Sequence, residues 1–446
     1  MPIDAPVDSD FPSRRRAWSV TVLLTFAFVF SFIDRQILNL LVGPIQADLG
    51  LSDTEISLLQ GFAFVSTYVV LSIPLGRLVD TSSRIPVLSA GIAFWSFATM
   101  ACGVVRGFSG LFIARAAVGL GEATLTPAGW SLLSDYFPPK RRLVPFSIFL
   151  TGPYIGAGIA MILGGVLMES LLSRPDLQLP LVGSISAWQA TFIAVGTPGL
   201  LLAAIVFCIR EPQRKEVLGD APNAVPAAEI IAWVKQHKRI YSALMLGVPF
   251  IALVLYGLQA WIPTYLIRVQ EMSLLEAGTQ YGSIALIAGS AGVLSGPFFG
   301  ALLQRRGYAD FQLRVALWVL LLVFPFLIGL AFAPSRTLAL VCIAAVSFLA
   351  PVPLALTATC IQAVTPNRMR GVMAGLHIAT VNVVGLALGP TSVAFATDVV
   401  FADGNSVGLS LSLVGCVACV AGVAMIAPAL RPLADLLNAQ SGTTTT

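Results

Sequence analysis

The stretch that decides the fold runs from Trp18 to Val42 and reads WSVTVLLTFAFVFSFIDRQILNLLV. It exceeds the roughly 20 apolar residues that a helix needs to cross the hydrocarbon core of a bilayer. Asp34 and Arg35 nevertheless interrupt it, and Glu122 interrupts a second apolar run, Leu111–Leu133, in the same way. An ionised side chain at bilayer depth costs about 2.5–3.5 kcal/mol on insertion scales, so such residues commonly mark a functional pathway.

The composition places the whole chain in the multi-span membrane class. Of its 446 residues, 57% are hydrophobic and 11% are charged, whereas a soluble protein carries about 25% charged residues. The first apolar run is too long for the core of a cleavable signal peptide. The sequence predicts twelve membrane spans, at 18–43, 54–76, 85–105, 109–136, 143–170, 187–209, 240–267, 276–303, 312–333, 336–363, 370–397 and 405–430.

The positions of the basic residues predict the orientation. Of the 26 Lys and Arg residues, 20 lie on the side of the spans that carries the N-terminus. Such an excess is typical of the cytoplasmic side. Both termini are therefore expected in the cytoplasm of a multi-pass cell-membrane protein. The net charge of +4 is explained by the basic residues on the cytoplasmic side, so it does not indicate a nucleic-acid partner.

The longest polar stretch divides the spans into two groups of six. The predicted fold is an all-α membrane protein of 12 transmembrane helices in two six-helix bundles, with short loops that leave no room for a soluble catalytic domain. The central stretch contains an amphipathic segment expected to lie on the inner membrane surface. The predicted parts are a tail at 1–17, bundles at 18–210 and 240–433, a central loop at 211–239 and a tail at 434–446.

Short motifs in the first half resemble a known family. The stretch from Gly76 to Arg84, GRLVDTSSR, is similar to the span 2–3 loop motif of the major facilitator superfamily, and the stretch from Arg115 to Ala123, RAAVGLGEA, is similar to its span 4 motif. Within the superfamily, Ile33-Asp34-Arg35, Gly121-Glu122-Ala123 and Trp261-Ile262-Pro263 resemble the Spinster family of lysolipid and sphingosine-1-phosphate transporters. The resemblance implies a major facilitator fold and transport by alternating access between its two bundles.

The same resemblance implies a cytoplasmic gate. Asp80 is expected to hold the start of span 11 through the positive end of that helix, and Arg77 and Arg84 are expected to pair with Asp135. Ordinary loop charge is the alternative interpretation. The predicted gate residues are Gly76, Arg77, Asp80, Arg84 and Asp135.

The charged residues inside spans 1 and 4 suggest proton coupling. Arg115 and Glu122 are seven residues apart, so they share a helix face at a separation of about 10 Å, and Asp34 falls between them in depth. Spans 1 and 4 line the cavity in the resembled superfamily. We predict that Asp34 and Glu122 bind protons, and that Arg35 and Arg115 tune them and receive an anionic head group. A structural ion pair without proton movement is the alternative.

The second half carries only weakly polar groups inside its spans. The predicted cavity residues are Tyr256, Gln259, Thr357, Gln362, His377 and Asn382. A lone His in an apolar helix, such as His377, is more typical of hydrogen-bonded structure than of a proton site. Charge on one wall and apolar groups on the other favour an amphipathic substrate over a fully polar one.

The sequence therefore predicts a proton-coupled secondary transporter of an anionic or zwitterionic lipid, similar to a lysophospholipid or sphingosine-1-phosphate. A proton-coupled organic-anion symporter and a lipid-binding receptor that does not transport are the alternatives. No metal-ligand spacing, Ser-His pair or nucleotide-binding loop supports an enzyme. The expected partners are the lipid, protons and the bilayer; no cofactor or metal is expected, and a monomer is the expected functional form.

Overall fold

The computed structural model describes residues 11–138, 141–172, 177–179, 183–214 and 226–442. Within these ranges, 12 helical stretches are long and apolar enough to cross a membrane, which confirms the predicted spans. Three basic residues, Lys140, Arg174 and Lys215, lie outside the described ranges, as do parts of the two tails and the central loop. The chain divides into two compact units, each described by itself below.

Unit 1 consists of residues 1–49 and 63–219 and contains most of the first six spans. The only strands in the part of the chain that is described form an antiparallel hairpin in the loop between spans 5 and 6, with Leu177 opposite Ile185. The elements of unit 1 are α1 (Arg14–Leu40), α2 (Val42–Leu49), α4 (Ala63–Thr81), α5 (Arg84–Cys102), α6 (Phe108–Glu122), α7 (Leu125–Tyr136), α8 (Leu143–Leu172), β1 (Leu177–Leu179), β2 (Gly183–Ile185) and α9 (Ala187–Phe207).

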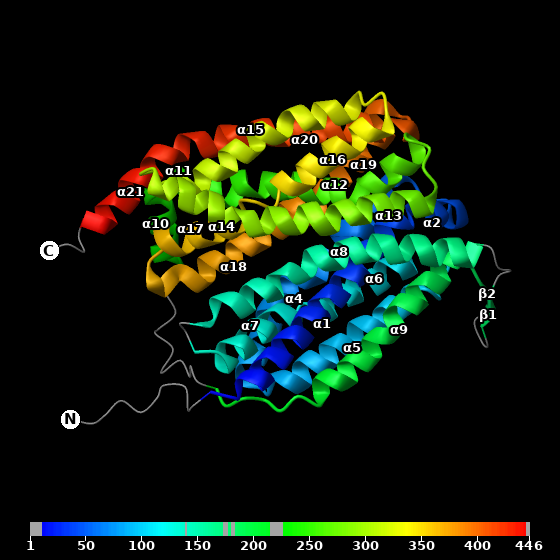
Figure 1. Cartoon of the computed structure of the whole chain (residues 1–446), viewed down its shortest axis with the longest axis horizontal. Coiled ribbons are helices and arrows are strands. Elements are labelled where there is room, and N and C mark those ends of the chain that lie inside the picture. The colour runs from blue at the N-terminus through cyan, green and yellow to red at the C-terminus, as the bar shows by residue number, and fades with distance from the viewer. Residues whose placement is uncertain (1–10, 139–140, 173–176, 180–182, 215–225, 443–446) are drawn as a thin grey trace. The chain divides into compact units, whose positions relative to one another are not determined.

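Glycines allow the close approach of α1 and α8, which pack along each other in unit 1 (Figure 1). A Cβ placed on Gly156 of α8 would lie 2.5 Å from the backbone oxygen of Val29 and 2.7 Å from the Cβ of Phe32. Gly152 and Gly164 meet α1 in the same way. Small residues at such contacts are typical of membrane helices, whose association depends on close packing because lipid is as apolar as their side chains. This packing holds the half of α1 that carries Asp34.

Unit 2 consists of residues 50–62 and 220–446. Short π-helical and 3-10 turns, labelled η, join many of its helices. Its elements are α3 (Asp53–Ser57), η1 (Leu58–Phe62), α10 (Ala227–Gln236), α11 (Lys238–Ser242), η3 (Ala243–Gly247), α12 (Val248–Arg268), α13 (Leu274–Ile284), η4 (Ala285–Gly289), α14 (Ser290–Arg305), α15 (Phe311–Ala331), α16 (Arg336–Leu349), α17 (Leu354–Val364), η5 (Asn367–Met369), α18 (Arg370–Thr380), η6 (Val381–Ala387), α19 (Leu388–Phe395), η7 (Ala396–Phe401), η8 (Gly404–Ser406), α20 (Val407–Ile426), η9 (Ala427–Ala429) and α21 (Leu430–Gly442).

The first turns of span 2, α3 and η1, belong to unit 2 although the rest of that span, α4, belongs to unit 1. Gly61 in η1 explains the contact, because a Cβ there would lie 2.1 Å from the backbone oxygen of Leu386 in η6. Gln60 donates from Nε2 to the backbone oxygen of Ala260 in α12 at 3.2 Å. The second span is therefore shared between the two units, which the hydropathy pattern does not indicate.

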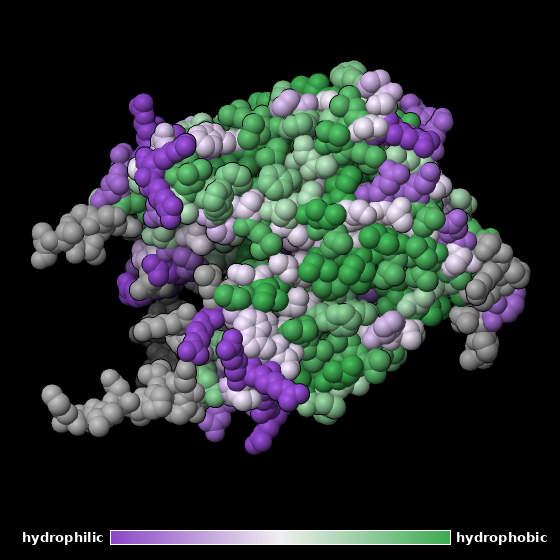
Figure 2. Space-filling view, viewed as in Figure 1, coloured by the Kyte–Doolittle hydropathy of each residue, from purple (hydrophilic) through white to green (hydrophobic). Residues whose placement is uncertain are grey.

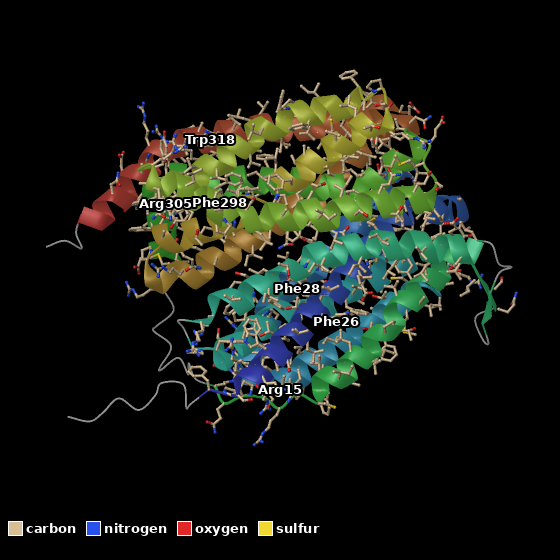
Figure 3. The ribbon with its side chains drawn as sticks, in the orientation of Figure 1. Arg15, Phe26, Phe28, Phe298, Arg305 and Trp318 are labelled. Carbon is tan, nitrogen blue, oxygen red and sulfur yellow. The ribbon has the colours of Figure 1, made fainter. Side chains whose placement is uncertain are left out.

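The surface of each unit has the polarity expected in a bilayer. Hydrophobic side chains occupy the middle of the visible face of the helices, and hydrophilic ones gather at the helix ends (Figure 2). Large apolar residues such as Phe26 of α1 and Phe298 of α14 point outward, 50% and 67% exposed, while Arg15 and Arg305 lie at helix ends (Figure 3). Such exposure would be unfavourable in water but is expected where lipid covers the helices.

Candidate transport site

Four residues of α1 and α6 form a buried cluster in unit 1, named here the intramembrane charge cluster: Asp34, Arg35, Arg115 and Glu122. None of the four is more than 8% exposed. Glu122 is the last residue of α6, and a short turn separates it from α7. The structure thus brings together all four residues that the sequence predicts in spans 1 and 4.

Arg35 and Glu122 form a direct ion pair between α1 and α6. The Nη2 atom of Arg35 lies 2.5 Å from Oε2 of Glu122, and the hydroxyl of Ser31 donates to the same oxygen at 2.6 Å. The Glu122 side chain is fully buried. One carboxylate oxygen therefore accepts hydrogen bonds from two side chains of α1.

Aromatic rings enclose the guanidinium of Arg35. Its Cζ atom lies 4.4 Å from the ring centroid of Phe32 and 4.1 Å from that of Phe64, and the ring of Tyr68 lies at 5.9 Å. Cation–π contacts of this kind stabilise a desolvated cation. These rings give Arg35 favourable contacts besides Glu122.

Arg115 binds the backbone of α1 beside the charged side chains. Its Nη1 donates to the backbone oxygen of Asp34 at 3.0 Å, and its Nη2 donates to that of Arg35 at 3.3 Å. Arg115 is fully buried. Its planar fork thus ties α6 to α1 at the residues that carry the charges. Its part in head-group recognition stays a prediction.

Asp34 lies on the side of the cluster nearest α5. Its side chain is 1% exposed, and Thr99, Trp95, Glu122 and Arg115 are the groups that act on its carboxyl. Its Oδ1 atom has no hydrogen-bond partner in the described chain. The two acids of the cluster therefore have different surroundings, since Glu122 is paired with a cation and Asp34 lies beside neutral groups of α5.

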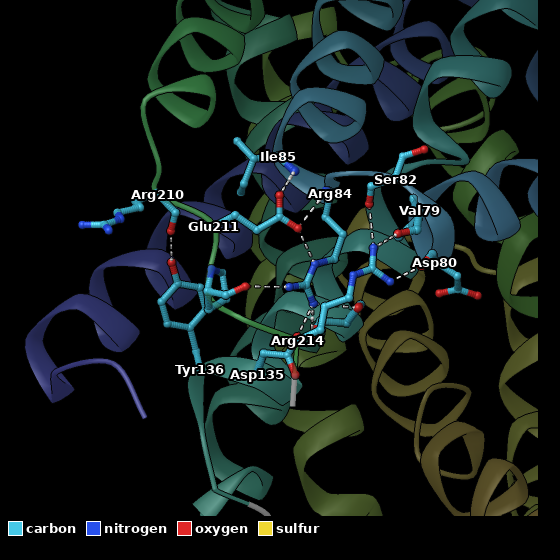
Figure 4. A network of polar contacts seen from close by, with 12 residues as sticks. Val79, Asp80, Ser82, Arg84, Ile85, Asp135, Tyr136, Arg210, Glu211 and Arg214 are labelled. Atoms are coloured by element: carbon cyan, nitrogen blue, oxygen red, sulfur yellow. Dashed lines mark hydrogen bonds and ion pairs between the residues drawn. The ribbon is translucent and has the colours of Figure 1, made fainter. Parts of the chain in front are cut away.

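A second network lies at the end of unit 1 where α1 begins, and it contains the predicted Arg84–Asp135 pair (Figure 4). Arg84 is fully buried although it is the first residue of α5. Besides Asp135, its Nε donates to Oε1 of Glu211 at 2.8 Å, and its Nη2 donates to the backbone oxygen of Pro212 at 3.1 Å. Arg84 thereby connects α5, α7 and the segment that follows α9.

Glu211 is the less buried of the two acidic partners of Arg84, with its side chain 23% exposed against 6% for Asp135. Burial by itself would raise the pKa of Glu211, but hydrogen bonds from the backbone and side chain of Arg84 outweigh it and hold the pKa below the ordinary value of 4.5. Glu211 is therefore ionised at neutral pH and contributes its bond to Arg84 there.

The other predicted gate residues have fewer contacts. Arg77 and Asp80 are exposed at the end of α4, and Gly76 is half-buried. The backbone oxygens of Val79, Asp80 and Ser82 accept hydrogen bonds from Arg214 (Figure 4). Arg214 thus fixes the α4–α5 turn through its backbone, whereas the Asp80 carboxylate makes no ion pair within the described part of unit 1.

Unit 2 contains a third polar group, formed by the start of span 2. Asp53 and Arg268 make a bidentate ion pair with distances of 2.7 and 2.8 Å. The backbone and hydroxyl of Thr54 both donate to Oδ2 of Asp398 at 2.7 Å. These contacts hold α3 to the ends of α12 and η7.

The predicted polar residues of unit 2 are spread over several helices. His377 is 7% exposed, and its Nδ1 lies 3.0 Å from the backbone oxygen of Leu244, as expected for a structural histidine. Thr357 donates to the backbone oxygen of Leu354, and Asn382 to that of Ile378. Tyr256 and Gln259 are half-buried in α12, and Gln362 is exposed on α17.

Several residues of these sites had no role predicted from the sequence. Ser31, Phe64 and Tyr68 surround the Arg35–Glu122 pair, and Glu211 and Arg214 complete the network around Arg84. Glu211 comes one residue after Arg210, which directly follows the predicted sixth span, in an Arg-Glu-Pro step that could have indicated it. The others are ordinary apolar, hydroxyl or loop residues whose partners are distant in the chain.

Twelve membrane-spanning helices in two bundles, with a buried charge cluster in the first, define the scaffold of a membrane transporter. The chain belongs to the Major Facilitator Superfamily, whose family model matches residues 24–390.

Individual relatives refine this assignment. The chain is 25% identical to a bacterial homologue of the human lysosomal transporter Spinster, solved in an inward-facing, unoccupied conformation; the match has a TM-score of 0.76 and covers 96% of this chain and 98% of that one. It is 29% identical to an MFS-type efflux pump of Mycolicibacterium smegmatis, over 71% of this chain and 69% of the relative. It is 26% identical to a protein of Escherichia coli named "Probable L-galactonate transporter", over 70% and 68%.

Proposed function

We propose that this transporter couples proton movement to the transport of an anionic or zwitterionic amphipathic lipid, of the lysophospholipid or sphingosine-1-phosphate kind, by alternating access. The observation that carries the proposal is the buried pair of Arg35 and Glu122. Because the Glu122 carboxylate binds the Arg35 guanidinium, protonation of Glu122 would release Arg35 to bind an anion.

The coupling follows from the charges. While Glu122 is ionised, it occupies the guanidinium of Arg35 at 2.5 Å. Protonation of Glu122 removes the charge that holds Arg35, and the guanidinium then presents its fork to a phosphate or carboxylate. A bound anion conversely leaves Glu122 without its partner, which favours proton uptake. Proton binding at Glu122 and anion binding at Arg35 therefore strengthen each other by the same factor.

Asp34 is the second proton site in this proposal. It is buried beside neutral groups, and Glu122 and Arg115 act on it from α6. Its occupancy then depends on the charge state of Glu122, so the two acids release and bind protons as a coupled pair. Arg115, fixed to the α1 backbone, supplies a constant positive charge between them.

The lipid class is supported by the distribution of charge and by the relatives. The spans of unit 2 carry no Asp or Glu near their midpoints, which suits an apolar tail better than a sugar. A Spinster homologue is among the structures similar to this chain. The aromatic rings around Arg35 add apolar surface next to the site proposed for the head group.

The Arg84 network is proposed as the gate at its end of unit 1. Arg84 binds Asp135 and Glu211 together, and it thereby holds α5, α7 and the segment after α9 in one arrangement. Gly76, Arg77 and Asp80 complete this gate as the motif predicts. A gate of this kind stabilises one access state and does not itself recognise the substrate.

The test is flux of a labelled lysolipid or sphingosine-1-phosphate into proteoliposomes, with and without an imposed pH gradient. Wild type is expected to accumulate the lipid only with the gradient, and Asp34→Asn and Glu122→Gln are expected to lose that accumulation. Binding measured in detergent should weaken with rising pH in wild type and become independent of pH in Glu122→Gln. Flux that ignores the gradient in wild type refutes proton coupling. Binding without any flux supports the receptor alternative.

An organic-anion symporter is the second candidate, favoured by the similarity to the Escherichia coli protein whose name refers to L-galactonate. The same charge cluster serves either substrate, because Arg35 recognises the anionic group and not the tail. The same proteoliposomes assayed with labelled galactonate separate the two candidates. Gradient-driven uptake of galactonate, with no lipid flux, would replace the lipid assignment.

A further inference from the structure

Three buried polar atoms without partners gather around the Asp34 carboxyl. They are Oδ1 of Asp34, the indole Nε1 of Trp95 and the hydroxyl of Thr99. Trp95 and Thr99 are fully buried, Asp34 is 1% exposed, and both α5 residues act on the Asp34 carboxyl. They lie four residues apart and therefore share one face of α5. Buried polar groups are almost always hydrogen-bonded, so three buried polar atoms without a partner at one place require an explanation.

The chemistry of the two α5 side chains gives that explanation. An indole N–H is only a donor, and a threonine hydroxyl donates one hydrogen bond. Two donors facing a carboxyl stabilise the ionised form more than the protonated form, because hydrogen bonds to a charged acceptor are about twice as strong as neutral ones. These donors have no other partner in the residues that the structure describes.

Packing fixes the position of Trp95. A Cβ placed on Gly121 of α6 would lie 2.8 Å from both the Cβ and the backbone nitrogen of Trp95, so the two helices touch at this point. This contact places the Cβ of Trp95 firmly at the α5–α6 contact, and the indole N–H is one of the groups that act on Asp34. An indole N–H can donate to the carboxylate that forms when the proton leaves.

We propose that Trp95 and Thr99 are positioning residues that hold the Asp34 carboxylate after proton release and set the pH at which Asp34 is loaded again. This inference rests on the proposed function, because it assumes that Asp34 titrates. The charged or titratable groups that face Asp34 are Glu122 and Arg115 from α6 and Cys102 from α5. On α8, which packs along α1, Glu169 is the only Asp, Glu, Lys, Arg or His residue, and it lies in the last turn of that helix, beyond Gly164, which meets Ile37 and Leu40.

The test is an infrared pH titration of the carboxyl band of Asp34, assigned by its loss in Asp34→Asn, in liposomes without substrate or gradient. Trp95→Phe keeps an aromatic side chain, smaller than the indole, and removes the N–H, and Thr99→Val keeps the shape and removes the hydroxyl. Each is expected to move the midpoint of the band to higher pH by about one to two units. Ser96→Ala is the control, because the Ser96 hydroxyl donates to the backbone oxygen of Ile92 at 2.8 Å; it should leave the midpoint in place.

Each outcome is decisive. Unchanged midpoints in Trp95→Phe and Thr99→Val refute the positioning role, and so does a shift of equal size in Ser96→Ala. If Trp95→Phe fails to fold, Thr99→Val carries the test alone. A band that moves as expected while gradient-driven flux survives in Asp34→Asn supports the positioning role and refutes the proposed function. A wild-type band that does not titrate refutes both.

Discussion

Replacing Glu122 by Gln tests whether the buried ion pair is the energetic centre of the charge cluster. The change keeps the shape of the side chain and removes the charge that lies 2.5 Å from Arg35, in a pair whose side chains are 9% and 0% exposed. Removing one partner of such a pair costs about 3–5 kcal/mol, because the other charge stays buried. The rings of Phe32 and Phe64 already solvate part of the guanidinium, so we expect a loss of about 2–3 kcal/mol.

A double-mutant cycle isolates the interaction. Arg35→Gln alone should also destabilise unit 1, whereas the double variant leaves no unpaired charge and should be less destabilised than the two single variants added together, by about 2 kcal/mol. The assay is equilibrium unfolding in mixed micelles with increasing denaturing detergent, followed by tryptophan fluorescence at pH 7. Asp310 and Arg314 supply a matched control, because this pair has one partner 27% exposed and should couple by less than about 1 kcal/mol.

Two results would contradict an interaction between these side chains. Single-variant losses that add to within about 0.5 kcal/mol mean that Arg35 and Glu122 do not interact in the folded protein. Wild-type stability in Glu122→Gln would lead to the same conclusion. Either result would remove the observation on which the coupling between proton and anion rests.

Three further predictions concern packing, the start of span 2 and pH. Gly156→Ala should lower the thermal unfolding midpoint, because its Cβ would meet the α1 backbone at 2.5 Å, whereas Gly375→Ala, with nothing within 4 Å, should not lower it; equal midpoints would contradict the close packing. Arg268→Gln should speed hydrogen exchange in residues 53–62 by releasing Asp53, and unchanged exchange there would contradict this role. Glu211 has a lowered pKa, so its contribution to stability is present above pH 4.5 and lost as the pH falls below that value; Glu211→Gln should therefore be less stable than wild type at pH 7, by a gap that closes in acid, and a constant gap would contradict the assignment.

The sequence by itself determined the class of this protein and the positions of its spans. Hydrophobic runs of about 20 residues have one stable solution in a bilayer, the helix, because every backbone polar group must then be satisfied within the chain. The hydropathy pattern also singled out Asp34, Arg35, Arg115 and Glu122, since charge inside an apolar run is costly and therefore rare. The family motifs added the Arg84–Asp135 pair.

The tertiary structure alone decided which of these charges are partners. Arg35 pairs with Glu122 at a separation of 87 residues, and Arg115 donates to the backbone of α1. Only the placement of α5 beside Asp34 shows that the donors Trp95 and Thr99 act on its carboxyl. Hydropathy records only how deep a residue lies, whereas hydrogen bonds and ion pairs depend on which helix faces meet within a few ångströms, and that is decided by packing over the whole unit.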